Sequence, residues 1–214
     1  MVDYADRFGQ GGLNHLVDAD ALLAECDIDR NEIEWRKEFI GFDGEDARRL
    51  AEMQELFEAH ADQIAEDFYE NLTGHTQTMD IIGRSEKTVE QLKETQRAYL
   101  VTLASGEYDM EYFRNRARIG KIHDLLDMPM KHYIGQYGVY YDLIFDLLCD
   151  SLGENVTDAI VENAGVATDG GAAAKEGGTI TIDRNDLEAA VQEQVDDGMR
   201  DVLALLRAIN LDMQ

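Results

Sequence analysis

Residues 116–137, RARIGKIHDLLDMPMKHYIGQY, hold two of the five histidines of the chain and its only proline. His123 shares the expected inner face of a helix with Ile119 and Leu126, because side chains three or four residues apart lie on one side of a helix. A histidine among aliphatic groups loses hydration, more so when charged. It can be a core histidine bonded to a neighbour, or a neutral imidazole that ligates the iron of a flat apolar ring packed against Ile119 and Ile122. These residues alone leave both interpretations open.

Two hydroxyl side chains could serve such a site. Tyr69 follows Phe68 near the end of an expected helix, and a buried tyrosine hydroxyl needs a hydrogen-bond partner. That partner is either a backbone carbonyl or a ligand bound on the iron. Thr95 lies near the helix face formed by Leu92 and Tyr99. Its hydroxyl can bond back to the preceding turn, or form a polar pair with Tyr69.

Four tyrosines follow Pro129 at helical spacing, which is typical of a core stripe. Only Tyr133, which is nearest to His123 in the chain, is expected to contact the same side of the site. The four are Tyr133, Tyr137, Tyr140 and Tyr141.

Motifs for other kinds of site are absent from the sequence. There is no HExxH, no P-loop and no GxGxxG between a strand and a helix, and no recognisable nucleophile constellation. The remaining histidines lack partners at metal-ligand spacing; they are His15, His60, His75 and His132. Cys26 and Cys149 form no CxxC motif, which argues against a zinc ribbon. Reduced thiols are the simplest interpretation, although a disulfide stays open.

The charge of the chain is strongly negative, with 45 acidic and 19 basic residues and a net charge of −26. Nucleic acid and anionic membrane surfaces are therefore poor partners, because phosphates need a basic surface. Such a charge also destabilises the compact state unless salt screens it. Acid excess with little lysine favours a halophilic source, the alternative being an acidic mesophilic protein. With no membrane-spanning apolar run and no N-terminal secretion signal, we expect a soluble, cytoplasmic protein.

The hydrophobic pattern predicts an all-α fold of seven or eight helices joined by short loops. A polar, Gly-bearing arm is expected over 1–17, and a flexible Gly-rich connection with a short β-like TITI fragment over 153–182. The helical stretches are 18–28, 29–42, 43–74 as two helices, 85–106, 109–126, 129–152 and 183–214.

Four segments together resemble the globin domain of globin-coupled sensors, of the haem-based aerotaxis transducer type. They are FYENL (68–72), KTVEQLKETQRAYL (87–100), GEYDMEYFRNRARIGKIHDLLDMP (106–129) and YIGQYGVYYDLI (133–144). The likeness covers roughly residues 28–150 and resumes at 202–214. It implies a globin-like fold with an extra N-terminal helix, the one that contains Trp35, and haem b (iron protoporphyrin IX) as the cofactor.

The resemblance also implies roles for individual residues. His123 matches the proximal iron ligand, and Tyr69 matches the distal tyrosine that donates a hydrogen bond to the gas. Thr95 matches a distal threonine that takes part in ligand-dependent rearrangement, and Tyr133 a proximal-side tyrosine linked to signalling. The expected cofactor-binding residues are Phe68, Tyr69, Leu92, Thr95, Tyr99, Ile119, Ile122, His123, Tyr133 and Tyr137, with His123 as the metal ligand and no catalytic residue.

The function implied by the resemblance is oxygen sensing rather than catalysis. O2, with CO or NO as other ligands, would bind at ferrous haem, and the change would pass to a signalling partner or transducer domain in aerotaxis. A haem enzyme such as an NO dioxygenase, or a stand-alone oxygen-binding globin, is the alternative. Residues 18–214 would form the sensor globin domain, without its output domain. Family members pair through helices equivalent to 129–152 and 183–214, and a Gly/Ala-rich insertion at about 165–178 departs from the family pattern.

Overall fold

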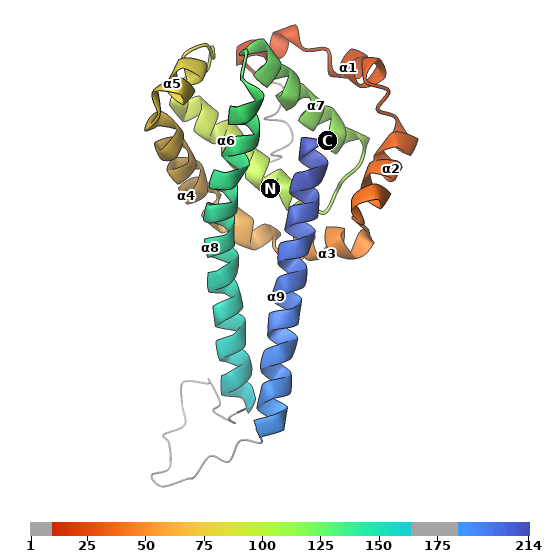
Figure 1. Ribbon diagram of the computed structural model, residues 1–214, viewed down its shortest axis with the longest axis vertical. Helices are drawn as coiled ribbons and strands as arrows, with labels where there is room; N and C mark the ends of the chain where they lie inside the picture. Colours follow the sequence, from red (N-terminus) through yellow and green to blue (C-terminus); the bar gives the residue numbers. More distant parts are fainter. Residues whose placement is uncertain (1–9, 164–183) are drawn as a thin grey trace. The chain divides into compact units, whose positions relative to one another are not determined.

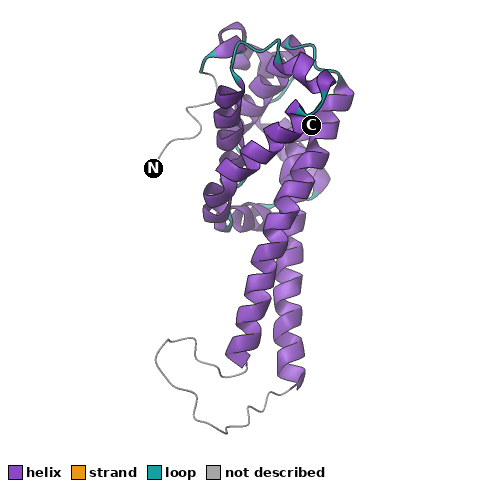
Figure 2. Ribbon diagram, turned by 90° about the vertical axis from the view of Figure 1, so that its left-hand side faces the viewer, coloured by secondary structure: helices purple, strands orange, loops and turns teal. Residues whose placement is uncertain are grey.

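The computed structural model describes residues 10–163 and 184–214, and all of its regular secondary structure is helical (Figure 2). The prediction of an all-α fold is therefore confirmed. In chain order the elements are the 3-10 helix η2 (Gly12–Leu16) and the α-helices α1 (Ala19–Glu25), α2 (Arg30–Ile40), α3 (Gly44–Glu52), α4 (Gln54–Thr73), α5 (Thr76–Ile82), α6 (Val89–Leu103), α7 (Met110–Leu125), α8 (Met130–Asn163) and α9 (Arg184–Met213) (Figure 1).

The chain divides into two compact units. The first comprises the chain up to Ile144 together with Leu203–Gln214, and the second comprises Phe145–Val202. The helices α8 and α9 contribute to both. None of the helices in the described ranges is long and apolar enough to cross a membrane.

Short polar side chains begin most helices of the first unit. The side chains of Asp29, Asp43 and Asp109 accept hydrogen bonds from the first backbone N–H groups of α2, α3 and α7. Thr88 does the same for α6, where Gln91 completes a capping box. Free N–H groups at a helix start need such acceptors, and each cap contributes about 1 kcal/mol. Part of the acidic excess is thus used to define helix starts.

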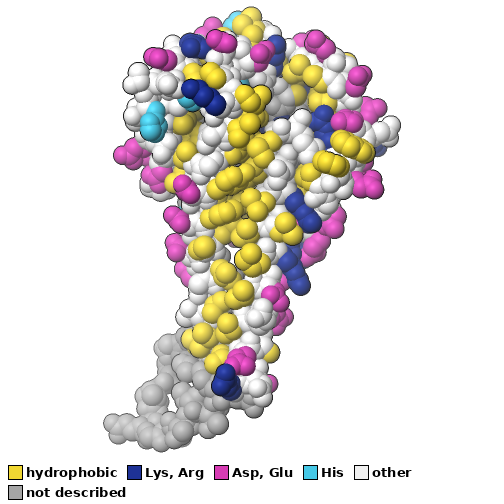
Figure 3. Space-filling view, in the orientation of Figure 1, with side chains coloured by type: hydrophobic (Ala, Val, Ile, Leu, Met, Phe, Trp, Pro, Cys, Tyr) yellow, Lys and Arg dark blue, Asp and Glu magenta, His cyan; other side chains and the backbone are white. Residues whose placement is uncertain are grey.

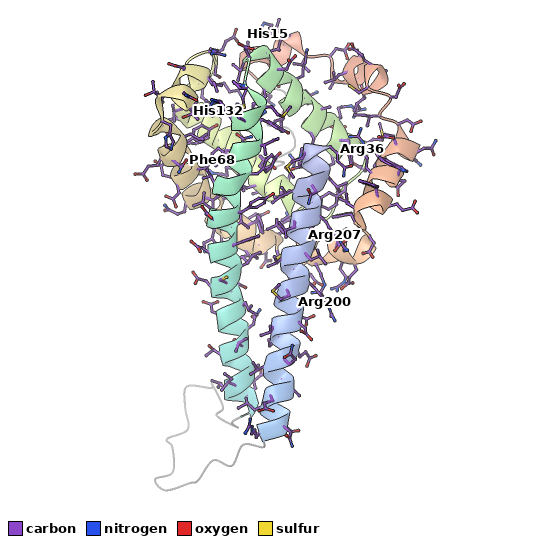
Figure 4. All side chains as sticks on the ribbon, in the orientation of Figure 1. His15, Arg36, Phe68, His132, Arg200 and Arg207 are labelled. Carbon is purple, nitrogen blue, oxygen red and sulfur yellow. The ribbon has the colours of Figure 1, made fainter. Side chains whose placement is uncertain are left out.

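The first unit encloses an apolar core. Within it α4 packs against α6, and α1 packs against α7. The last turns of α9 belong to this core, and Arg207 (labelled in Figure 4) donates to both carboxylate oxygens of Asp46 in α3, at 3.1 and 2.9 Å. The largest fully buried side chains are Leu50, Phe57, Leu100, Leu103, Ile144, Leu205 and Ile209.

In the second unit the α8 and α9 segments lie side by side. A Cβ atom on Gly198 would lie 2.8 Å from Cδ1 of Leu152, so the two helices approach closely at a residue without a side chain. This contact explains why α8 continues to Asn163 although the sequence predicted an end near residue 152: packing against α9 offsets the roughly 1 kcal/mol that Gly153 costs inside a helix.

Three other expectations differ from the structure. The two-turn helix α5 was not predicted, because seven residues with one buried side chain, Ile81, show no clear period. Gly12–Leu16 forms a helix where the sequence predicted a flexible arm. Trp35 and Phe39 share the apolar spacing of Ile33, yet only Ile33 is buried, while the two aromatic rings stack on the exposed surface of α2. The Gly/Ala-rich insertion and the TITI fragment lie outside the described residues.

Candidate haem-binding site

A cavity in the first unit is bounded by residues from η2 and from α4 to α9. It offers about 160 Å³ to the centres of water-sized molecules, roughly ten times what a single water needs. All ten residues that the sequence analysis proposed as cofactor contacts line it. The structure thus brings these residues together around one space; their roles toward a cofactor stay a prediction.

His123 lies in the last turn of α7 and borders this cavity. Its Nδ1 atom is buried and has no hydrogen-bond partner among the described residues. Its ring contacts the ring of Tyr133 edge-on, with 5.5 Å between the centroids. Burial lowers the pKa of His123 to about 4, because charging an imidazole away from water is unfavourable. The side chain is therefore neutral at physiological pH, which is the form that ligates metals.

Tyr69 and Phe68, near the end of α4, supply two of the aromatic rings of the lining (Figure 4 labels Phe68). Phe68 stacks on Tyr140 at 4.6 Å between centroids. The Tyr69 ring is buried, and its hydroxyl has no hydrogen-bond partner among the described residues. Burial raises the pKa of Tyr69, so the hydroxyl keeps its proton. It is therefore available to donate a hydrogen bond into the cavity.

Thr95 lines the cavity from α6. Its hydroxyl donates to the backbone carbonyl of Gln91 at 3.0 Å, which is the back-bond that the sequence analysis left open. The same oxygen accepts a hydrogen bond from the ammonium group of Lys87, also at 3.0 Å. A polar pair between Thr95 and Tyr69 is not formed. The hydroxyl instead belongs to a short chain that ends at a cation.

A buried polar cluster borders the cavity where α9 ends. The carboxylate of Asp212 accepts hydrogen bonds from the hydroxyls of Tyr99 (2.7 Å) and Tyr112 and from Nε of Arg116 (2.9 Å). The backbone carbonyl of Asp212 accepts from the hydroxyl of Tyr133 at 3.4 Å. One residue of α9 is thereby tied to α6, α7 and α8. Because Tyr112 and Arg116 are buried and the carboxylate of Asp212 is almost fully shielded from solvent, this cluster fixes the positions of four helices around the cavity.

The lining is better suited to a cofactor that carries its own metal ligands than to a bare metal ion. His123 is the one histidine in the lining, and the residues that the structure describes contain no group of three or more His, Cys, Asp or Glu side chains able to hold a metal. A bare ion would need at least three or four protein ligands. An iron porphyrin needs one axial imidazole and an apolar slot, and the residues present fit that requirement.

Comparisons with known proteins agree with this chemistry. A family model described as Protoglobin matches residues 29–214. The chain belongs to the protoglobin family. Over 150 residues it is 45% identical to the "Heme-based aerotactic transducer HemAT" of Halobacterium salinarum, an alignment that covers 68% of the chain and 31% of that relative. The expected globin-like fold is thereby confirmed, and haem b is the cofactor of this family of globins.

Several lining residues were not predicted from the sequence. Asp212 lies almost 90 positions from His123, and an acidic residue among 45 carries no signal of its own. Lys87 precedes a helix, where a lysine is expected to lie at the surface. Asn14 belongs to the N-terminal stretch that the sequence assigned to a loose arm. One sequence signal could have identified Arg116 as a lining residue: it lies seven residues before His123, which places both on the same side of a helix.

Proposed function

We propose that this protein is a cytoplasmic haem-based oxygen sensor in which His123 is the axial iron ligand. The proposal is supported above all by one arrangement: a neutral His123 with a buried Nδ1 atom and a protonated Tyr69 whose hydroxyl bonds to none of the described residues line the same cavity. The name of the Halobacterium relative points to the same activity. Because the alignment covers 31% of that relative, its role in aerotaxis comes to this chain as part of the proposal.

The chemistry of His123 and of Tyr69 suits each of them to one role in the proposed site. When bound, the haem supplies an iron atom with an open position for a diatomic gas. His123 presents a neutral imidazole nitrogen, since its low pKa prevents protonation at physiological pH. Tyr69 presents a hydroxyl donor in an apolar surrounding, where a hydrogen bond to a polarised ligand is strongest. Such a donor favours O2 over the less polar CO.

A path for the signal is visible on the side of His123. Tyr133 contacts the His123 ring, and its hydroxyl bonds to the carbonyl of Asp212 in the last turn of α9. A displacement of the His123 ring would press on Tyr133 and change the hydrogen bond from its hydroxyl to Asp212. The hydroxyl of Tyr137 donates to Tyr133 at 3.4 Å, so a second residue of α8 would respond. A sensor of this kind needs a coupling free energy of about 1–3 kcal/mol between its two states.

A second copy of the chain is the partner that we propose for α8 and α9. Figure 3 shows apolar side chains along these two helices. Within the second unit they include Ile160 on α8 and Val195 and Met199 on α9, all exposed. Exposed apolar residues repeated along two helices are typical of an interface. Pairing through these helices would let a change at Tyr133 reach a dimer contact and, from there, a signalling domain or partner.

The absorption spectrum of the purified protein tests the site. Wild-type protein with added haem should show a Soret band and distinct ferrous and oxygenated spectra. His123→Ala should lose haem or hold it loosely, whereas His75→Ala, at an exposed histidine, should keep the wild-type spectrum. Equal retention by both variants would contradict the assignment of His123. Sustained NO consumption with a reductant would instead favour a haem enzyme.

Light scattering after size exclusion tests the dimer. Val195→Gln combined with Met199→Gln should shift the mass of the wild-type dimer toward the monomer. The control is Met79→Gln, which removes an equally apolar, exposed residue from α5. A monomeric wild-type protein, or a dimer that the double variant leaves intact, would refute this part of the proposal.

A further inference from the structure

Lys87 extends from the loop before α6 into the wall of the cavity. Its ammonium group lies 3.0 Å from the hydroxyl of Thr95, eight residues further along the chain. Its aliphatic stem lies against η2, where a Cβ on Gly12 would come within 3.1 Å of Cγ of Lys87. Gly12 has a φ of +55°, so a side chain there would be strained as well. The N-terminal segment thus holds the stem of Lys87 toward the cavity.

The charges of the lining do not balance. Lys87, Arg116 and Arg118 are cations, while Asp212 is the single carboxylate among the lining residues. Arg116 forms an ion pair with Asp212. Arg118 donates to the neutral amide oxygen of Asn115, and Lys87 donates to Thr95. Two of the three cations, Lys87 and Arg118, therefore have no carboxylate of the described residues at contact distance, in a chain whose net charge is −26.

Three of the four other described lysines, Lys37 among them, pair with carboxylates, whereas the exposed Lys131 donates to the amide oxygen of Gln77. Lys93 pairs with Glu66 and Glu90, and Lys121 pairs with Asp124. Partial burial lowers the pKa of Lys87, with Glu94 opposing the effect. Withdrawing an ammonium group from water is unfavourable unless a nearby negative group compensates for the lost hydration. Among the described residues no carboxylate contacts Lys87, although these residues include most of the acidic side chains of the chain, and this is a feature that needs a cause.

We propose that Lys87 and Arg118 bind the two carboxylate side chains of the haem. This inference rests on the proposed haem site and goes beyond it by assigning the polar edge of that site. Both cations lie on elements that η2 contacts, since Gly12 lies against Lys87 and η2 packs against α7, which carries Arg118. The two propionates of haem b match the two unbalanced charges in number and sign. Lys87 would then leave Thr95 for a carboxylate, which frees one acceptor position on that hydroxyl.

Haem and its dimethyl ester distinguish this role from a structural one. The ester has the same iron and ring but no carboxylate charge. Transfer of ferric haem to an excess of apomyoglobin measures its loss from wild type, Lys87→Met and Arg118→Met. Each variant should lose haem about tenfold faster than wild type, which corresponds to ~1.4 kcal/mol. Each should lose the dimethyl ester at the wild-type rate. Lys93→Met, which removes a lysine of α6 that is paired with Glu66 and Glu90, is the control and should match wild type with both porphyrins.

Three results would overturn the inference or part of it. Equal acceleration for haem and ester would mean that the substitutions merely loosen the pocket. Unchanged haem loss in both variants would show that the carboxylates lie elsewhere, while the Soret band of wild type would still uphold the haem site. An effect at Lys87 alone would remove Arg118 from the proposal. A wild-type protein that takes up neither porphyrin would refute the proposed function itself.

Discussion

Arg116 and Asp212 form an ion pair at 2.9 Å whose side chains are only 7% and 2% exposed. The guanidinium also lies over the rings of Tyr99 and Tyr112, 4.4 and 4.3 Å from their centroids. Asp212 accepts hydrogen bonds from both of these tyrosines as well. This pair joins the helix that carries His123 to the last turn of α9, at the edge of the cavity. Its integrity is thus required both for the fold and for the proposed signal path.

Asp212→Leu should destabilise the protein severely. The substitution leaves the buried guanidinium of Arg116 without its counter-charge, and breaking a buried pair from one side costs about 3–5 kcal/mol. The free energy of unfolding, measured by urea titration of the haem-free protein, should fall by that amount. Adding Arg116→Met should recover much of the loss, because no buried charge then remains.

The exposed pair of Arg200 and Asp197 provides the control for this cycle. Its side chains are 63% and 46% exposed, and pairs of this kind contribute roughly 0–1 kcal/mol. Arg200→Met should therefore leave the urea midpoint almost unchanged. If Asp212→Leu were no worse than Arg200→Met, the buried pair would have no special role in stability.

Tyr69→Phe should speed oxygen dissociation while leaving CO binding nearly unchanged. The substitution removes one donor to a polarised ligand, and such charge-assisted hydrogen bonds contribute about 1.5–3 kcal/mol. Stopped-flow mixing should show a rate increase of roughly ten- to a hundredfold. Tyr108→Phe is the matched control, because that buried tyrosine bonds to the carbonyl of Leu103 and does not line the cavity. Equal effects on O2 and CO would assign Tyr69 a packing role.

Salt should stabilise the protein markedly. With 45 acidic and 19 basic residues the folded chain repels itself, and raising the salt from 0.1 M to 1 M shortens the Debye length from about 10 Å to about 3 Å. The thermal midpoint of the haem-free protein should rise steeply over this range of KCl and level off above it. A midpoint that is constant or falls would favour an acidic protein adapted to low salt over a halophilic one.

The order and type of the long helices could be predicted from the sequence because their signals are local. The stretches expected over 29–42 and 109–126 start at Asp29 and Asp109, whose side chains cap α2 and α7, and Pro129 directly precedes α8. The start of α6 differs from the expected start at residue 85, since Thr88 caps the helix and accepts from its first turn. The end of α8 could not be predicted, because Leu152 and Gly198 meet across a sequence gap that no local pattern describes.

The site shows the same division. His123 and Tyr69 could be nominated as candidates because an imidazole among aliphatic residues and a Phe–Tyr pair near a helix end are visible within single helices, while their roles toward a haem are implied by the resemblance. Lys87 could not be found in this way. Its proposed role depends on the lack of a nearby carboxylate among the described residues, which is a property of the folded surroundings. Asp212 acquires its role from three partners on three other helices. Contacts between helices that are distant in the chain therefore could not be predicted from the sequence.

The pH dependence of stability should carry a contribution from His123. Its pKa is about 4 in the folded haem-free protein, below about 6.5 in an unfolded chain. Between these values the unfolded chain binds a proton that the folded chain excludes. The contribution of the neutral His123 to the free energy of unfolding is therefore fully present above pH 6.5 and is lost as the pH falls toward 4.

Comparing the haem-free wild type with His123→Leu should isolate that contribution. Between pH 7 and pH 5 the unfolding free energy of wild type should fall by about 1–2 kcal/mol more than that of the variant, because one unit of pKa shift equals about 1.4 kcal/mol. The many carboxylates titrate alike in both proteins and cancel in the difference. His75→Leu, at an exposed histidine, is the control, and its difference from wild type should stay constant. Parallel pH profiles for wild type and His123→Leu would mean that the His123 ring reaches water in the folded protein, which would also weaken its assignment as a buried ligand.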